Sequence, residues 1–321
     1  MKRSAPKFEQ LRAGKKHIHI HGHRGARGIL PENTLDGFRF TFDAGVRVVE
    51  LDVLMTADDV PVLTHNPHLL ADSTRDATGN WLTADSAGPL VRELSYAELQ
   101  TYDVGGLQPG SEYAARFPEQ AFLYEQRVPT LEKLCALVNH PNYADVWLNI
   151  EIKSTPHFPG YTPAPAHYVD TVLNVLRRQR MEQRVILQSF DWRVVHECAR
   201  QAPDIPRSYL TYSALDGRDP LEINVYPDSP WMDGLQLSEH AGNLPALIAA
   251  ADGQVWAPYH EDLTAEAMAA ARACGLMVNT WTVNELVDID RVVELGVDGI
   301  ITDYPGRVQR RLLDHGLGWG W

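Results

Sequence analysis

The feature that most constrains the fold is a regular alternation of short apolar runs and amphipathic stretches from residue 146 to residue 302. The apolar runs predict strands at about 146–153, 184–189, 207–212, 254–257, 276–282 and 299–302. The amphipathic stretches predict helices at about 166–181, 191–202, 243–251, 264–274 and 284–295. Such alternation is typical of a parallel sheet that is covered by helices.

The N-terminal part of the chain adds three strands, at about 17–22, 46–53 and 60–64, and one helix that Asn33 or Thr34 caps. A second helix is expected at about 130–139. For a chain of 321 residues this favours one (β/α)8 TIM barrel, although nine strands are one too many. Because no helix fits between the strands at 46–53 and 60–64, that corner departs from the regular pattern.

Residues 68–127 show little periodicity and are rich in Gly, Pro, Asp, Ser and Tyr. A structureless loop of this length is uncommon inside a domain unless it is functional. We therefore predict one catalytic domain over residues 1–321 with a small inserted subdomain at 68–127, after the third strand and over the mouth of the active site.

The first strand leads directly into His21-Gly22-His23-Arg24-Gly25, so two imidazoles and a fixed cation follow a strand end. The next strand carries Glu50 and Asp52, and the strand at 146–153 carries Glu151 and Lys153. Residues two apart on a strand share one face, so each pair points the same way. A solvent-facing edge strand would also give this alternation, but two such strands in a βα rhythm favour a common rim.

Three neighbouring carboxylates repel one another, and a divalent cation removes that cost. Since all the donors are oxygens, Glu50, Asp52 and Glu151 predict a Mg²⁺ or Ca²⁺ site and not a zinc site. His65 follows the strand at 60–64 and meets the same rim, where it forms a candidate acid/base pair with His23. With Arg24 and Lys153 as anion ligands, the set describes metal-assisted attack on a phosphorus ester.

Other polar and aromatic residues give weaker signals. His17, His19 and His21 alternate with His23 on one strand, which fits a metal site less well than a solvent-facing or barrel-floor run, and only His21 is kept near the site. Trp281, Phe190 and Asn284 follow later strands. We expect Trp281 to contact substrate, Phe190 to pack in the core, and Asp303 to support the site or begin a loop.

Composition narrows the class of function. The net charge of −13 argues against a nucleic-acid partner, which would require a basic patch. The three cysteines Cys135, Cys198 and Cys274 lie in helix-like apolar stretches and are expected to be reduced core residues. No apolar run follows the basic N-terminus or reaches the length of a membrane span, so we expect a cytoplasmic protein without stable membrane insertion. The sequence leaves open whether it forms a homo-oligomer.

Short motifs in a fixed order resemble those of the glycerophosphodiester phosphodiesterase family over most of the chain. They are His23-Arg24-Gly25-Ala26, Pro31-Glu32-Asn33-Thr34, Glu50-Leu51-Asp52-Val53, Val62-Leu63-Thr64-His65-Asn66, Val128-Pro129-Thr130-Leu131-Glu132, Ile150-Glu151-Ile152-Lys153, Ser189-Phe190, Trp281-Thr282-Val283-Asn284 and Ile301-Thr302-Asp303-Tyr304-Pro305. Each motif is modest alone, but their order and spacing together are specific.

The resemblance implies a phospholipase-C-like TIM barrel that hydrolyses a glycerophosphodiester to glycerol 3-phosphate and an alcohol. It implies that His23 and His65 are the acid/base pair, that Glu50, Asp52 and Glu151 hold the metal, and that Arg24 and Lys153 bind phosphate. One departure is Asn66, where the family usually has Asp. An amide in this place hydrogen-bonds the histidine but does not stabilise an imidazolium by charge.

Two alternatives remain. A related lysophospholipase D or sphingomyelinase D would need a wide apolar mouth for acyl chains, whereas residues 68–127 are mostly polar. A non-catalytic phosphodiester sensor would be expected to lack some of the histidines, carboxylates or cations, and here the set is complete.

Overall fold

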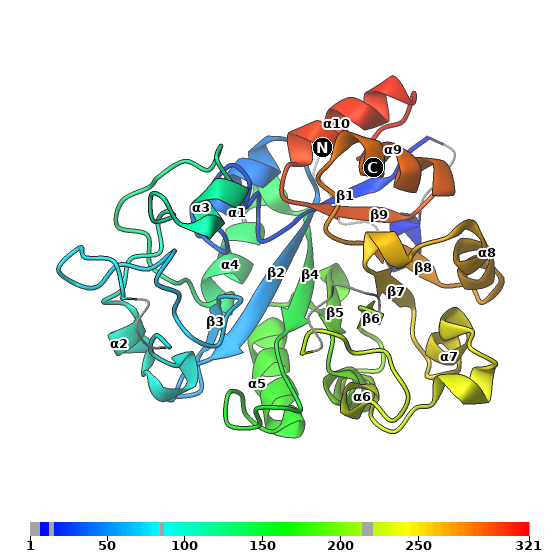
Figure 1. Cartoon of the computed structure of the whole chain (residues 1–321), viewed down its shortest axis with the longest axis horizontal. Coiled ribbons are helices and arrows are strands. Elements are labelled where there is room, and N and C mark those ends of the chain that lie inside the picture. Colours follow the sequence, from blue (N-terminus) through cyan, green and yellow to red (C-terminus); the bar gives the residue numbers. More distant parts are fainter. Residues whose placement is uncertain (1–6, 13–15, 84–86, 214–220, 321) are drawn as a thin grey trace.

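Eight parallel strands form a closed barrel in the computed structural model, which describes residues 7–12, 16–83, 87–213 and 221–320 (Figure 1). The barrel strands are β1 (His19–Gly22), β2 (Val48–Met55), β4 (Trp147–Ile152), β5 (Val185–Ser189), β6 (Arg207–Thr211), β7 (Val255–Pro258), β8 (Met277–Thr280) and β9 (Gly299–Thr302). β1 pairs in parallel with both β9 and β2, and this pairing closes the barrel. The predicted TIM-barrel fold is confirmed.

The ninth predicted strand is β3 (Pro61–Leu63), which lies outside the barrel. It runs antiparallel to the end of β2, with Val53 opposite Leu63 and Met55 opposite Pro61. A tight turn that begins at Thr56 joins the two strands. It is closed by a hydrogen bond from the backbone N–H of Thr56 to the carbonyl of Val60. The turn leaves no space for a helix, which explains the irregular corner in the sequence pattern.

Helices surround the barrel in Figure 1, and all of them except α10 begin and end within a few residues of the sequence expectations. They are α1 (Leu35–Asp43), α4 (Leu131–Val138), α5 (Pro165–Arg178), α6 (Trp192–Gln201), α7 (Leu244–Ala250), α8 (Ala265–Ala273), α9 (Leu286–Leu295) and α10 (Pro305–Asp314). Thr34 caps α1 by accepting from the Gly37 N–H, and Gly296, at φ 75°, ends α9. The sequence interpretation missed α10, which starts at Pro305.

Short 3₁₀ helices complete the description: η1 (Phe8–Leu11), η2 (Val91–Glu93), η3 (Pro141–Tyr143), η4 (Glu182–Arg184), η5 (Pro230–Met232), η6 (Leu237–His240) and η7 (His260–Asp262). η1 packs against the N-terminal end of the barrel, where Leu11 joins a buried apolar cluster with Trp147 and Met277. This cluster fills the barrel floor and leaves the opposite, C-terminal end for polar side chains.

The outward faces of the strands pack against the helices. The isoleucines of β4, Ile150 and Ile152, are fully buried in the largest apolar cluster, between the sheet and helices α4 and α5. Inward-facing positions of the same strand are Asn149 and Glu151. β4 is therefore buried on both faces, but only its outward face is apolar along its whole length.

The described residues of the 68–127 segment, 68–83 and 87–127, contain η2 and two short helices, α2 (Tyr96–Leu99) and α3 (Glu112–Arg116), and are otherwise irregular. In Figure 1 they lie beside β3 and α4 at one side of the barrel. Their treatment as a separate subdomain over the active-site mouth stays a prediction.

The three cysteines were expected to be reduced core residues, and no membrane span was expected. Cys135 and Cys198 are buried and Cys274 is partly buried, and none of the three forms a disulfide. In the parts of the chain that the structure describes, no helix combines the length and the apolar character needed to cross a bilayer.

Candidate active site

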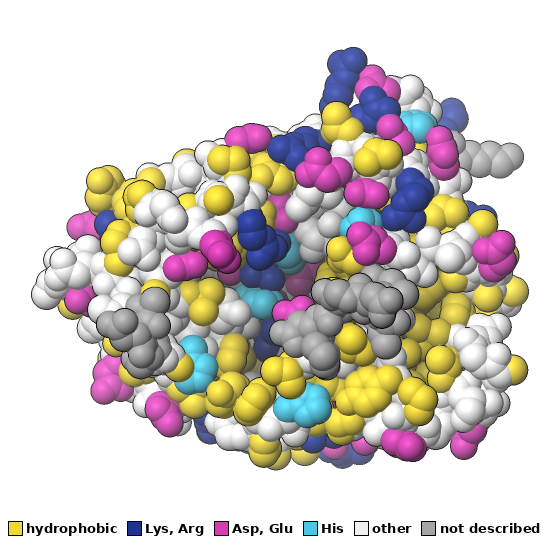
Figure 2. All heavy atoms as spheres, viewed as in Figure 1, with side chains coloured by type: hydrophobic (Ala, Val, Ile, Leu, Met, Phe, Trp, Pro, Cys, Tyr) yellow, Lys and Arg dark blue, Asp and Glu magenta, His cyan; other side chains and the backbone are white. Residues whose placement is uncertain are grey.

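The predicted site residues converge at the C-terminal end of the barrel strands. The chain leaves β1 in a tight turn that places Arg24 at φ 51° and Gly25 at φ 92°. The backbone N–H of Arg24 donates to Glu50 Oε2 at 3.2 Å, which ties this turn to β2. Figure 2 shows a hollow near the centre of this face, in which basic, acidic and histidine side chains are visible.

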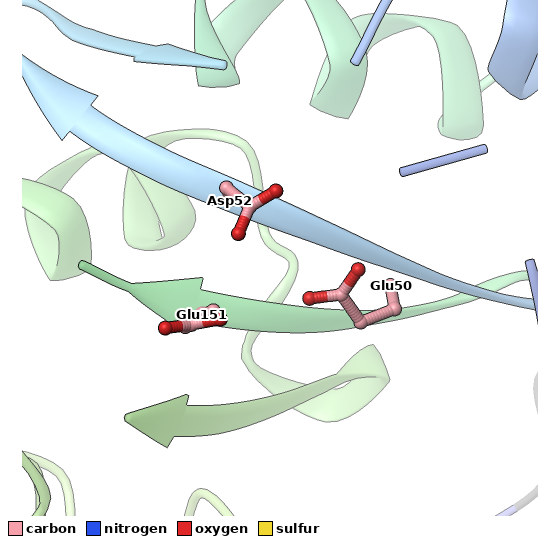
Figure 3. Close-up of side chains that lie close together, drawn as sticks. All are labelled: Glu50, Asp52 and Glu151. Atoms are coloured by element: carbon pink, nitrogen blue, oxygen red, sulfur yellow. The ribbon is translucent and has the colours of Figure 1, made fainter. Parts of the chain in front are cut away.

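Glu50, Asp52 and Glu151 point toward one another from β2 and β4 (Figure 3), and each offers an oxygen within 4.8 Å of the others. All three side chains are buried. Burial and the neighbouring carboxylates raise the pKa of Glu50 well above its usual value. Burial also raises the pKa of Glu151. Burial opposes ionisation of Asp52 too, but Arg24, His65 and Lys153 hold its pKa below the usual range.

This cluster fits a hard divalent cation. Its donors are all carboxylate oxygens, which suit Mg²⁺ or Ca²⁺. The raised pKa values of Glu50 and Glu151 indicate buried negative charge that the protein's own cations do not fully offset. Among the described residues it is also the one group of histidine, cysteine and acidic side chains with a spacing suited to a metal.

Arg24 and Lys153 flank the cluster as fixed cations. Arg24 Nη1 lies 3.0 Å from Glu32 Oε1, and Arg24 Nε lies 3.1 Å from Asp52 Oδ2. Lys153 Nζ lies 2.8 Å from Glu151 Oε1 and 3.8 Å from Asp52 Oδ1. Burial disfavours both charges, but the carboxylates outweigh it and raise the pKa of each cation. Both side chains therefore stay charged beside the cluster.

His23 lies between the cluster and Asp303 at the end of β9. Its Nδ1 is 2.7 Å from Asp303 Oδ1, and its Nε2 is 3.8 Å from Glu50 Oε2. Burial opposes ionisation of Asp303, but Arg27 and His23 hold its pKa low, so the carboxylate accepts the proton of Nδ1. Burial lowers the pKa of His23, and Asp303 partly offsets this effect. The Nε2 atom thus remains available on the side of the carboxylates.

His65 approaches the same cluster from the loop after β3. Its Nδ1 lies 3.1 Å from Asn66 Oδ1, so the ring donates to an amide where His23 donates to a carboxylate. Burial, with Arg24 and Lys153 nearby, lowers the pKa of His65 well below its usual value. The imidazole is therefore neutral near pH 7, and no hydrogen bond from another described residue occupies its Nε2.

Aromatic side chains form a wall at the ends of β5 to β8. The ring centroid of Trp281 is 5.2 Å from those of Phe190 and Tyr259, and 5.8 Å from that of Tyr212. Lys153 Nζ lies 5.7 Å from the Phe190 ring centroid. The aromatic wall therefore lies beside the charged half of the site, which is formed by the carboxylate cluster, Arg24 and Lys153. Phe190, which the sequence assigned to the core, is only partly buried and lies at this rim.

The structure adds supporting residues that sequence reasoning missed or left open. Arg27 donates to both oxygens of Asp303, and Asn284 Nδ2 donates to Asp303 Oδ2 at 2.7 Å. Asn33, at φ 55°, donates to Asp52 Oδ2 at 3.0 Å, and Gln188 donates to Glu50 Oε1 at 3.2 Å. The Pro31-Glu32-Asn33-Thr34 motif was the signal for Asn33, whereas nothing in the sequence set Arg27 apart.

His21 does not reach the rim. It is buried and lies two residues before His23 in the chain. Its Nδ1 is 3.5 Å from Asn149 Nδ2, and burial lowers its pKa to about 3. His17 and His19 lie nearer the floor with ring centroids 5.1 Å apart. Within the described residues, none of these histidines belongs to a group spaced for a metal ion.

Comparison with known proteins gives a consistent result. The model of the glycerophosphoryl diester phosphodiesterase family matches residues 23–307. A solved structure from Silicibacter pomeroyi, assigned as a glycerophosphoryl diester phosphodiesterase, is 47% identical with a TM-score of 0.85 and covers 98% of this chain and 99% of its own. A glycerophosphodiester phosphodiesterase of Caldanaerobacter subterraneus is 25% identical over 284 residues, which is 88% of this chain and 93% of the relative.

A more distant structure shares the fold. The phosphodiesterase of Oleispira antarctica, solved with its product sn-glycerol-3-phosphate, is 20% identical with a TM-score of 0.64. The alignment covers 92% of this chain and 96% of that one.

Proposed function

The chain belongs to the glycerophosphoryl diester phosphodiesterase family, and from that premise we propose how its own residues cleave a glycerophosphodiester to glycerol 3-phosphate and an alcohol. It is a phosphoric diester hydrolase, as its motifs predicted. The observation that carries the proposal is the meeting of two histidines, two cations and three carboxylates at one end of the barrel.

Arg24 and Lys153 bind the phosphodiester in this proposal. Both are buried cations beside the cluster, and each faces two carboxylates: Arg24 faces Glu32 and Asp52, and Lys153 faces Glu151 and Asp52. They hold the non-bridging oxygens and offset the negative charge that develops on them. Together with a divalent cation at the cluster, these two cations would offset the repulsion of an anionic substrate by a chain of net charge −13.

His65 and His23 differ in a way that suggests their roles. The neutral His65 is suited to accept a proton from the neighbouring glycerol hydroxyl as that hydroxyl attacks phosphorus and the alcohol leaves. Water then opens the cyclic phosphodiester to glycerol 3-phosphate. The Asp303 carboxylate, 2.7 Å from His23, favours the imidazolium form against the effect of burial, so a His23 that has taken up a proton is suited to donate it to the leaving alcohol oxygen. Asp303 contacts Nδ1 of His23 and Asn66 contacts Nδ1 of His65, so Nε2 is the ring atom left for proton transfer in each.

Glu50, Asp52 and Glu151 would hold a divalent metal, Mg²⁺ or Ca²⁺, and their oxygen-only donor set and shared burial support this. When bound, such a cation polarises a phosphoryl oxygen and stabilises developing negative charge. The protein's own contribution is to keep the three carboxylates in place, through Asn33 on Asp52 and Gln188 on Glu50.

The substrate in this proposal is a small glycerophosphodiester. The Oleispira relative, solved with sn-glycerol-3-phosphate, supports this substrate class. Trp281 and the aromatic wall lie beside the charged half and would contact the part of the substrate that carries no phosphate. A lysophospholipid substrate is the alternative that differs by its acyl chain.

The test is turnover of glycerophosphocholine and lysophosphatidylcholine with Mg²⁺, Ca²⁺ or EDTA, by wild type and by His23→Asn and His65→Asn. We expect release of glycerol 3-phosphate from glycerophosphocholine, and a loss of about a hundredfold or more in each variant. His167→Asn is the control, because His167 is exposed and pairs with Asp59.

Full activity in either site variant would refute its assignment. Faster cleavage of lysophosphatidylcholine would favour the lysophospholipase alternative. Binding of glycerophosphocholine without turnover in the presence of metal would favour a sensor.

A further inference from the structure

One helix of the 68–127 segment reaches the phosphate-binding arginine. The hydroxyl of Tyr113, in α3, donates to Glu32 Oε2. The other oxygen, Glu32 Oε1, accepts from Arg24 Nη1 at 3.0 Å. Glu32 therefore bridges this segment to Arg24 with one carboxylate oxygen for each partner.

The guanidinium of Arg24 is oriented by two carboxylates. Asp52 Oδ2 lies 3.1 Å from its Nε, and Asp52 is itself fixed by Asn33. Glu32 contacts a different nitrogen, Nη1, and is less buried than Asp52, with 19% side-chain exposure against 1%. The orientation of Glu32 thus depends more on a partner that holds it, and Tyr113 is that partner.

Tyr113 is itself held in place. Its ring centroid lies 5.4 Å from that of Phe117, and Phe117 packs under the Arg27 guanidinium at 4.5 Å. Arg27 Nη1 donates to the Tyr113 hydroxyl at 3.5 Å. Since Arg27 also binds Asp303, α3 touches the supports of both Arg24 and His23.

We propose that Tyr113 is a positioning residue for phosphate binding, which orients Glu32 and, through Glu32, the guanidinium of Arg24. This inference rests on the role of Arg24 under the proposed function. It assigns a task to the 68–127 segment: to complete the phosphate-binding side of the site from outside the barrel.

The hydroxyl of Tyr113 acts in two ways that have the same sign. It fixes the carboxylate of Glu32, and therefore one of the two contacts that orient Arg24. It also offsets part of the negative charge of Glu32, which would otherwise repel an anionic phosphate group nearby. Loss of the hydroxyl should weaken the binding of phosphate more than it slows the chemical step.

The first experiment measures the dissociation constant of inorganic phosphate by calorimetry, with the full chain supplied with Mg²⁺. Tyr113→Phe should raise it about tenfold, the loss of one hydrogen bond to a charged group. KM for glycerophosphocholine should rise similarly and kcat should change less. Tyr96→Phe is the matched control in the same segment, because its hydroxyl accepts from Lys133 at 3.0 Å, away from Glu32 and Arg24. The unfolding midpoints of the two variants should agree.

A double-mutant cycle tests whether Tyr113 acts through Glu32. In a Glu32→Ala background, Tyr113→Phe should change phosphate binding by less than twofold. Independent, multiplicative effects of the two substitutions would overturn the inference, as would an unchanged dissociation constant in Tyr113→Phe alone.

Arg24→Ala separates this failure from failure of the proposed function. If Arg24→Ala loses phosphate binding while Tyr113→Phe retains it, only the positioning role of Tyr113 is refuted. If Arg24→Ala binds phosphate as wild type does, both the role of Arg24 and the inference built on it are refuted.

Discussion

His23 Nδ1 lies 2.7 Å from Asp303 Oδ1, although the two residues are 280 positions apart in the chain. The contact joins the ends of β1 and β9, which are the strands that meet where the barrel closes. Asp303 is fully buried and also accepts from Arg27 and Asn284. The carboxylate is thus fixed from three sides and holds His23 with Nδ1 protonated and Nε2 toward Glu50.

Asp303→Asn should lower kcat by about a hundredfold or more, because the amide cannot stabilise the imidazolium of His23 by charge. The pKa of His23, which burial already lowers, should fall further, so the limb of the pH–rate profile that reports His23 should move to lower pH. The measurement is kcat against pH for both proteins.

Asp290→Asn is a matched control for this change. Asp290 also accepts from an arginine and a histidine, Arg311 and His315, but on the surface between α9 and α10. It should leave the pH–rate profile unchanged. A profile of Asp303→Asn with wild-type kcat and the same limbs would contradict the role given to His23.

Asn66→Asp should move the pH–rate limb that reports His65 upward by about one unit or more. A carboxylate beside the imidazole favours its charged form and raises its pKa, which burial, Arg24 and Lys153 now hold well below the usual value. If His65 is the general base, activity at acidic pH falls, because more of the ring is protonated there.

Asn66→Ser serves as the comparison, since it keeps a hydrogen-bonding side chain and adds no charge. It should not move the limb upward. An unchanged profile in Asn66→Asp would mean that His65 does not set the observed pH dependence.

Sequence reasoning located the chemistry of the rim because it depends on local rules. Residues two apart on a strand share a face, and the ends of parallel strands meet at one rim, so Glu50, Asp52 and Glu151 were expected together. The barrel itself followed from the alternation of strands and helices. These expectations did not require knowledge of any long-range side-chain contact.

The supporting contacts depend on long-range packing and were not predictable in the same way. Arg27 looks like any surface arginine until the barrel closes and brings it to Asp303. Tyr113 lies 81 positions from Glu32, in a segment without periodicity, so no pattern relates the two. Helix α10 was missed because Pro305 follows the last strand and was taken for a loop signal, whereas Pro is favoured at a first helical position.

Divalent metal should stabilise the wild-type protein against heat, and Glu151→Gln should remove most of that effect. At a hundred times the dissociation constant, a bound ligand contributes about 2.7 kcal/mol to the free energy of unfolding. In EDTA, Glu151→Gln should unfold at a higher temperature than the wild type. The reason is that the substitution neutralises one of three buried carboxylates that repel one another. Thermal unfolding with Mg²⁺, Ca²⁺ and EDTA measures both parts.

Glu112→Gln, on the exposed surface of α3, is the control and should respond to metal as wild type does. Equal unfolding midpoints of the wild type in metal and in EDTA would argue against a metal site at these carboxylates.

The turn that carries His23 and Arg24 depends on Gly22, where a Cβ atom would lie 2.1 Å from the backbone oxygen of Gly25 and 2.7 Å from Thr41 Cγ2. A backbone oxygen cannot move aside as a flexible side chain can, so Gly22→Ala should displace the turn. We expect a loss of about 1–3 kcal/mol in the free energy of unfolding. Activity should fall further than the unfolded fraction explains, since the side chains of His23 and Arg24 shift with the turn.

Gly306→Ala is the opposite case, because its Cβ would meet nothing within 4 Å and alanine favours α10. The free energy of unfolding of this variant should rise by up to about 1 kcal/mol, with unchanged activity. Denaturant unfolding and kcat/KM, measured on both variants, distinguish a displaced turn from a general cost of adding a methyl group.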